Sequence, residues 1–167
     1  MTPESAFAAW VGPHIGMLRR ISRAFAAAAD QNDLLQELLI SAWKAYPNFR
    51  GESSAATFLY RVAHNRALTW KRKEGLRLFR FWQAAPDIAA VVADSGNPED
   101  HRRLEALYAA IRQLAPVDRS LILLSLEGAS YAEMAALHGL SESNIGARLS
   151  RARTRLTTLV SEASDGL

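Results

Sequence analysis

The chain has 167 residues, of which 49% are apolar, and its formal net charge is +3. This length suits one domain or two small ones, and the absence of cysteine excludes disulfides and thiolate metal sites. We expect a cytoplasmic protein without membrane insertion, because the sequence has no N-terminal signal pattern and no apolar run that would span a bilayer.

The N-terminal part is predicted to form two helical segments. Residues 5–29 carry apolar side chains at helical spacing, with an interruption near Gly12-Pro13. Residues 30–46 form the next predicted helix, which ends before Pro47. This helix starts with acidic residues, and its apolar side chains occupy most of its circumference. It is therefore either a central core helix or a surface that docks a partner.

A short polar loop around Phe49 precedes a helix that is predicted to start at Ser53 or Ser54 and to end near Lys73. The outer half of this helix carries basic and amide groups. Such a face beside a loop aromatic suits single-stranded or opened DNA, because bases stack on aromatic rings while cations follow the phosphates. A solvated basic helix explains the same pattern. The outer residues are Thr57, Arg61, His64, Asn65, Lys71 and Arg72.

Residues 76–100 are predicted to link two helical modules. The turn-forming residues of Asp94-Ser95-Gly96-Asn97-Pro98 favour a loop at the end of this stretch. Two helices are expected next, over residues 101–114 and 118–126, and Ala115-Pro116 separates them.

Residues 128–159 carry the pattern of a helix-turn-helix. Ser130 and Glu133 form an S-x-x-E capping box, which predicts the start of a helix. Gly139 can adopt the left-handed conformation that ends a helix, and Ser141 is a good N-cap for the next one. Two short helices joined by such a turn are typical of this motif. Residues 161–167 are expected to fray.

The second helix of this motif is predicted to have one buried and one polar side. Ile145, Leu149, Ala152 and Leu156 recur at helical spacing and form the buried stripe. Small side chains lie opposite, with arginines along both edges, and this combination suits the major groove of DNA. A solvated arginine face is the alternative. The residues on the polar side are Ser143, Ala147, Arg148, Ser150, Arg151, Arg153, Thr154 and Arg155.

No pattern in the sequence predicts catalysis. The histidines, at positions 14, 64, 101 and 138, lack metal-ligand spacing, and there is no phosphate-binding glycine loop or nucleophile–base motif. We therefore expect no catalytic residue, metal or cofactor, and no enzymatic activity. His64 is expected at a DNA face and His138 at a helix end.

Taken together, these segments resemble the extracytoplasmic-function (ECF) group of the sigma-70 family of bacterial RNA polymerase sigma factors. The matching pieces follow the order and spacing of that family. They are residues 30–37, 42–43, 49–54, 57–65, 114–119, 128–135 and 141–156.

The resemblance implies an all-α fold with two small helical domains joined by a flexible linker. Residues 1–75 would form sigma region 2, residues 76–100 the linker, and residues 101–162 sigma region 4. It also implies a factor that binds core RNA polymerase, recognises promoter DNA and starts transcription. An anti-sigma factor is expected as a further partner.

The resemblance assigns the sites as follows. The clamp helices of the largest polymerase subunit would bind Asp33, Leu34, Gln36 and Glu37. Unpaired bases of the minus-ten element would meet Phe49, Arg50, Ser53, Thr57, Arg61, Asn65, Lys71 and Arg72. The duplex minus-thirty-five element would meet Ser141, Ser143, Asn144, Ala147, Arg148, Arg151, Arg153 and Arg155. The flap of the second-largest subunit would support the other side of region 4.

The recognition helix departs from the family pattern at Gly146, where a lysine is common, and this glycine should weaken the helix by about 1 kcal/mol. Ala55 and Ala56 likewise stand where a basic and an aromatic residue are common. A stand-alone helix-turn-helix regulator with an N-terminal sensing or dimerisation module is the alternative, and it would bind duplex DNA without polymerase.

Overall fold

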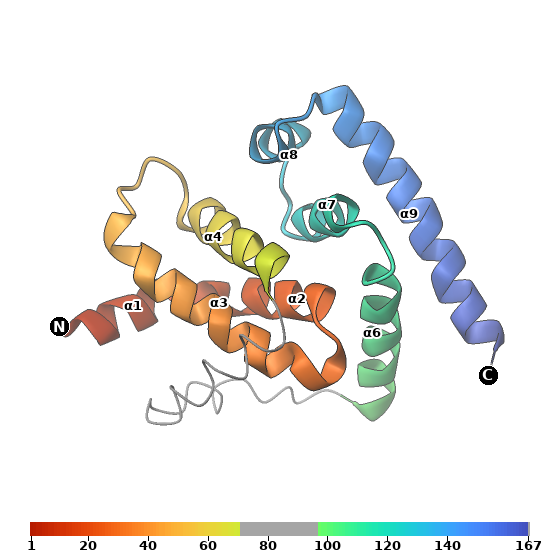
Figure 1. Ribbon diagram of the computed structural model, residues 1–167, viewed down its shortest axis with the longest axis horizontal. Helices are drawn as coiled ribbons and strands as arrows, with labels where there is room; N and C mark the ends of the chain where they lie inside the picture. The colour runs from red at the N-terminus through yellow and green to blue at the C-terminus, as the bar shows by residue number, and fades with distance from the viewer. Residues whose placement is uncertain (71–96, 167) are drawn as a thin grey trace.

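The computed structural model describes residues 1–70 and 97–166, and these residues form helices without any strand. The predicted all-α class is confirmed for this part of the chain. Residues 71–96 and 167 lie outside the described residues, and they include Lys71, Arg72 and most of the predicted linker. Figure 1 shows the helices as an N-terminal group, α1 to α4, and a C-terminal group, α6 to α9.

The N-terminal group contains α1 (Pro3–Val11), α2 (Ile15–Phe25), α3 (Gln31–Ala45) and α4 (Ala55–Thr69). The predicted interruption is a short 3-10 turn, Gly12–His14, in which Pro13 occupies the first turn. A similar turn, Tyr46–Asn48, follows α3.

The apolar surface of α3 is used inside this group. The helix packs against both α2 and α4, and its residues Leu34, Leu38 and Ala42 are fully buried. Leu39 and Trp43 are half-buried and pack on the same core. The wide apolar circumference therefore belongs to a central core helix, which was one of the two alternatives that the sequence left open.

The C-terminal group contains α6 (Pro98–Ile111), α7 (Pro116–Leu126), α8 (Tyr131–His138) and α9 (Glu142–Asp165). Helix α6 begins before the expected residue 101, because the side chain of Asn97 accepts a hydrogen bond from the Glu99 N–H at 3.2 Å. Helix α9 continues through the tail that was expected to fray. Its last buried residue is Leu159.

The local signals around the turn are confirmed. The Ser130 N–H donates to Oε2 of Glu133 at 2.7 Å, and the Glu133 N–H donates to Oγ of Ser130 at 3.1 Å, which completes the capping box. Gly139 has a φ of +65° and ends α8 in the left-handed region. Ser141 caps α9 by accepting from the Asn144 N–H at 3.1 Å.

The two groups touch each other, mainly where α2 meets α6 and α7. The Arg20 Nε donates to Oε1 of Glu127 at 2.7 Å. Arg112 reaches in the opposite direction and donates to the backbone oxygen of Arg23 at 2.8 Å. None of the helices in the described parts of the chain is long and apolar enough to cross a membrane.

Candidate nucleic-acid interface

Helix α4 presents different residues to the core, to the C-terminal group and to solvent. Leu59 and Ala63 are fully buried. Arg61 and Asn65 are exposed and lie one turn apart, so they share a face. Of the predicted outer side, Arg61 and Asn65 are exposed, Thr57 is half-buried and His64 is buried, while Lys71 and Arg72 lie outside the described residues.

His64 corrects the expectation of a DNA-facing histidine, because its side chain is only 5% exposed. Its ring stacks on Tyr60, with ring centroids 5.7 Å apart. It also meets Phe25 of α2 edge to face at 5.8 Å. His138 was expected at a helix end, and it is the last residue of α8.

The loop before α4 is held by aromatic packing. Phe49 is half-buried, and its ring centroid lies 5.5 Å from that of Trp10 and 5.2 Å from that of Phe58. Arg50 is exposed beside it. Phe49 thus fixes the loop at the edge of the aromatic core while part of its ring stays accessible.

Ser54, rather than Ser53, caps α4. Its Oγ accepts from the Thr57 N–H at 3.1 Å and lies 2.9 Å from the Thr57 Oγ1. The hydroxyl of Thr57 is therefore already engaged within the cap. Ser53 is half-buried, and its hydroxyl donates to the backbone oxygen of Ser54 at 3.4 Å.

Helix α9 lies at the outer edge of the C-terminal group (Figure 1). The predicted buried stripe is confirmed for Ile145, Leu149 and Ala152, and Leu156 is half-buried. The predicted polar side is exposed except for Arg148, which is half-buried. Its exposed members are Ser143, Ala147, Ser150, Arg151, Arg153, Thr154 and Arg155, and Ser141 and Asn144 are also exposed where the helix begins.

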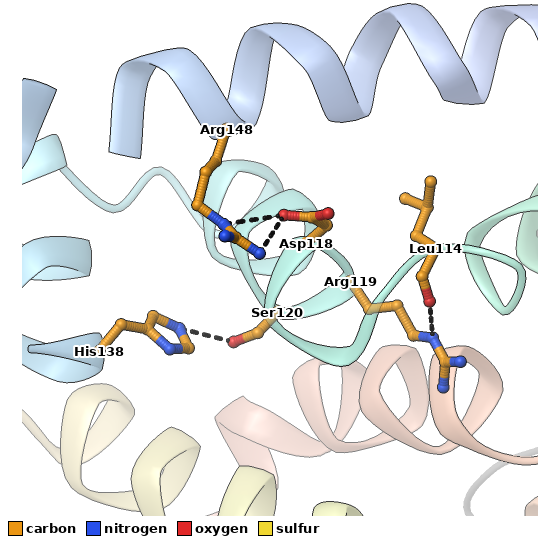
Figure 2. Close-up of polar contacts among 6 residues, drawn as sticks. All are labelled: Leu114, Asp118, Arg119, Ser120, His138 and Arg148. Atoms are coloured by element: carbon orange, nitrogen blue, oxygen red, sulfur yellow. Dashed lines mark hydrogen bonds and ion pairs between the residues drawn. The ribbon is translucent and has the colours of Figure 1, made fainter. Parts of the chain in front are cut away.

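The arginines of α9 have different surroundings. Arg148 is half-buried and forms an ion pair with Asp118 of α7 (Figure 2). Arg153 donates to the hydroxyl of Ser125 at 2.9 Å. Arg151 and Arg155 point from the exposed side of the helix. The side chains of these last two are therefore open to solvent.

Gly146 has a packing reason that the sequence did not reveal. A Cβ at this position would lie 3.2 Å from Cε2 of Tyr131, which is closer than ordinary van der Waals contact. The missing side chain lets the Tyr131 ring of α8 approach α9. Gly146 thus lowers the helix propensity of α9 but permits a close contact between the two helices of the motif.

The acidic helix α3 exposes only part of its predicted contact set. Asp33 and Gln36 are half-buried. Leu34 is fully buried, and Glu37 is 1% exposed and ion-paired with Arg66 of α4. Leu34 and Glu37 therefore hold the helix in place and do not offer their side chains to solvent.

Ser120 is a buried polar residue that the sequence reading missed. Its Oγ lies 2.9 Å from the Tyr60 hydroxyl and 2.9 Å from Nε2 of His138, as Figure 2 shows for the histidine. Nothing in the local sequence distinguishes this serine, because its partners are far away along the chain. It joins the N-terminal group to the C-terminal group.

Arg119, next to this serine, also joins the groups. Its Nε donates to the backbone oxygen of Leu114 at 2.8 Å (Figure 2). Its guanidinium lies 5.5 Å from the centroid of the Phe25 ring of α2. Burial, and then the charge of Arg112, lower the pKa of Arg119 from its usual value.

Two protein families match this chain. The family described as Sigma-70 region 2 matches residues 7–77. The family described as Sigma-70, region 4 matches residues 104–156. Together they include α2 to α4 and most of α6 to α9.

Curated relatives agree with these matches. The ECF RNA polymerase sigma factor SigG of Mycobacterium tuberculosis is 33% identical over 90% of this chain and 47% of its own length. This chain thus spans about half the length of SigG. The RNA polymerase sigma factor NccH of Alcaligenes xylosoxydans xylosoxydans is 29% identical, covering 94% of this chain and 88% of NccH. The ECF RNA polymerase sigma-E factor of Escherichia coli K12 is 30% identical, covering 81% of this chain and 76% of that protein.

Solved structures share the fold. The sigma factor RpoE, in complex with the anti-sigma factor NepR from Bartonella quintana, gives a TM-score of 0.63 at 23% identity and covers 93% of this chain and 97% of that chain. CnrH, in complex with the cytosolic domain of CnrY, gives a TM-score of 0.60 at 26% identity and covers 95% of this chain and 90% of that chain.

Proposed function

The chain belongs to the ECF group of the sigma-70 family, and from this we propose that it binds core RNA polymerase and directs promoter recognition and transcription initiation. The observation that carries the proposal is the pair of exposed faces on separate helical groups, Arg61 and Asn65 on α4 and the polar side of α9. In this scheme residues 1–75 act as region 2, residues 76–100 as the linker and residues 101–162 as region 4.

Region 2 would meet the clamp helices of the polymerase through α3. Asp33 and Gln36 are the members of the expected set with exposed surface. Leu34 and Glu37 would act indirectly, because they are buried and keep α3 on α4. An acidic group in the first turn of α3 is also favoured by the helix dipole.

The opened minus-ten element would lie on the exposed face of α4 and the loop before it. Arg61 would follow the phosphate backbone, and Asn65 offers amide groups to base edges. The exposed part of Phe49 would support an unpaired base by stacking. Arg50, Ser53 and Thr57 border this face, and Lys71 and Arg72 follow it in the sequence.

The duplex minus-thirty-five element would receive α9 in its major groove. Small side chains at Ser143 and Ala147 would let the helix approach the base edges, while Arg151 and Arg155 would meet phosphates. Ser141, Asn144 and Arg153 lie at the margins of this face. Arg148 would position the helix through Asp118, in place of the direct DNA contact expected from sequence.

An anti-sigma factor is part of the proposal, because the solved relatives RpoE and CnrH are each recorded with a binding partner, NepR and CnrY. The proposed role needs no catalytic residue, metal or cofactor in this chain. It would be exercised where polymerase and promoter meet, in the bacterial cytoplasm.

A run-off transcription experiment tests the proposal. Core polymerase, with and without the purified chain, is given a library of promoter fragments, and the transcripts are sequenced. We expect a specific subset of start sites that depends on the chain, and little duplex binding by the chain alone. Tight binding to a two-fold-symmetric duplex without polymerase, and no specific transcript, would instead support the stand-alone regulator.

A further inference from the structure

A polar contact joins α4 of the N-terminal group to α7 and α8 of the C-terminal group. The Tyr60 hydroxyl donates to the backbone oxygen of Ser120 at 3.2 Å and lies 2.9 Å from its Oγ. The same Oγ is 2.9 Å from Nε2 of His138 (Figure 2). Tyr60 and Ser120 are both buried, so this contact lies inside the interface.

Two histidines meet in this contact. The rings of His64 and His138 are 5.5 Å apart, with an angle of 82° between their planes. His64 is enclosed by His138, by the stacked ring of Tyr60 and by Phe25 of α2. The pair therefore exists only while the two helical groups are together.

The charged groups around this pair favour neutral imidazoles. The positive charge of Arg148 of α9 disfavours a proton on His138. Arg119 of α7 lies over the Phe25 ring that contacts His64. Each carboxylate nearby forms an ion pair with an arginine. Glu127, whose charge also reaches Tyr60, pairs with Arg20. Glu37 of α3 pairs with Arg66 of α4, and Asp118 pairs with Arg148. A proton on His138 would thus be added near the positive charge of Arg148, and a proton on His64 would be added at a buried site beside His138.

Burial is the main reason why the pKa of both histidines is lowered. It lowers the pKa of His64 from 6.5 to about 4, and the neighbouring His138 adds to this effect. Burial, and then Arg148, also lower the pKa of His138. A lowered pKa in the closed arrangement means that the separated groups bind protons more readily. The contact is therefore fully stable above about pH 6.5 and weakens as the pH falls from there toward 4.

The proposed function requires the two helical groups to separate. The biological consequence of this inference therefore rests on the proposed function. The position numbers that name the minus-ten and minus-thirty-five elements differ by 25, which corresponds to roughly 85 Å of duplex at 3.4 Å per base pair. A compact chain of this length has a radius of gyration of about 15 Å, which corresponds to a diameter of roughly 40 Å. Both elements cannot be held at once while the groups remain in contact.

We propose that His64 and His138 form a proton-sensitive latch: neutral imidazoles hold the two helical groups together, and protonation of either one releases them. Acidification would then favour the open arrangement that reaches both promoter elements. Because the chain has no cysteine, two introduced cysteines can carry labels at chosen positions. Lys44 on α3 and Ser161 on α9 are exposed and lie in different groups.

The test uses the full chain with Lys44→Cys and Ser161→Cys, each carrying a spin label, in the absence of polymerase. Pulsed electron paramagnetic resonance measures the distance between the two labels at about pH 8 and about pH 5.5. Titration of His64 alone should raise the open-to-closed ratio by up to about tenfold between these conditions, and His138 should increase it further. A change smaller than about twofold would overturn the latch.

Matched variants locate the effect. His64→Phe keeps a ring on Tyr60 and Phe25 but cannot bind a proton, and His138→Gln keeps an amide for Ser120. The double variant should stay closed at both pH values, whereas His101→Gln, at an exposed position on α6, should open like the parent chain. Opening of the double variant to the parent's extent would refute the proposal. Should His64→Phe fail to fold, as judged by helical circular dichroism, His138→Gln alone must reduce the shift, and an unreduced shift refutes it.

The latch and the proposed function fail separately. Run-off transcription that succeeds while the label distance ignores pH removes only the latch. A label distance that responds to pH in a chain that supports no transcription removes only the promoter role.

Discussion

Arg148 of α9 binds one carboxylate oxygen of Asp118 through two of its nitrogens, with Nε at 3.1 Å and Nη2 at 3.0 Å from Oδ1. Asp118 lies in the first turn of α7, so this pair ties the recognition helix to the helix on which it rests. Both side chains are partly exposed, at 30% and 25%, which limits the stability that the pair contributes to at most about 1 kcal/mol. The main role of this ion pair is to orient α9, and a change in DNA binding should therefore reveal its loss.

Asp118→Asn should weaken binding of the polymerase complex to the minus-thirty-five duplex by up to about fivefold, because α9 loses one anchor. The salt dependence of binding should not change, since no phosphate contact is removed. Arg148→Ala should behave the same way. Affinities measured over a salt series check this. A slope that flattens in Arg148→Ala would show that Arg148 meets a phosphate after all.

Arg151→Ala serves as the contrasting variant in the same salt series. Arg151 is exposed on the polar side of α9, so its loss should reduce affinity and lower the slope of log K against log salt by about one. Arg103→Ala is a control, because Arg103 pairs with Glu99 on the exposed surface of α6. An equal effect of both substitutions would point to net charge alone and not to a contact by α9.

Replacing Arg61 or Asn65 with alanine should reduce promoter opening while leaving duplex binding by region 4 intact. Each substitution removes an exposed group from α4, and the loss of one contact to opened DNA corresponds to roughly tenfold less open complex. Permanganate reactivity of unpaired thymines measures the opening. Unchanged reactivity in both variants would remove α4 from the minus-ten site.

Substitutions in α3 should separate folding from docking. Glu37→Ala removes a buried carboxylate that forms an ion pair with the half-buried Arg66 of α4, so the free energy of unfolding should fall by about 1–3 kcal/mol. Gln36→Ala should change unfolding by less than about 0.5 kcal/mol but weaken the affinity for core polymerase. Urea unfolding and a core-binding titration measure the two effects. Full core affinity in Gln36→Ala and Asp33→Ala would exclude this face as the docking surface.

The turn of the helix-turn-helix should be sensitive to Gly139. At a φ of +65°, Gly139→Ala forces a side chain into the left-handed region and should cost about 1–2 kcal/mol of stability. Gly12→Ala is the matched control, because Gly12 has a right-handed φ of −49° and open space around it. This control should be neutral or slightly stabilising. Equal losses in urea unfolding would contradict the role of backbone conformation.

The helices of the turn motif and the caps that begin them could be predicted because their signals are local. Ser130 and Glu133 are three residues apart and bond to each other's backbone, so the capping box forms from one short piece of chain. The periodic apolar residues of α9 predicted its buried side for the same reason. The start of α6 was placed too late, because the cap by Asn97 was read as part of a loop.

The histidine at position 64 shows the limit of such reasoning. Helical spacing placed it on the polar side of α4, but a helix that packs on two neighbours buries more than one stripe. Helix α4 packs against α2 and α3, and His64 also meets His138 of α8, which is far from α4 in the sequence. The same limit applies to Glu37, whose acidic character suggested a surface role until Arg66 was found beside it.

The sequence by itself determined the all-α class and the helix-turn-helix with its caps, because these depend on hydrogen bonds and spacings within a few residues. The order of its matching segments along the chain indicated the sigma-70 family. Only the tertiary structure decided which polar residues are available. Ser120 meets Tyr60 across 60 residues of chain and His138 across 18, and contacts at such separations are fixed by the packing of whole helices. Burial then altered the pKa of His64, which no local pattern of residues could indicate.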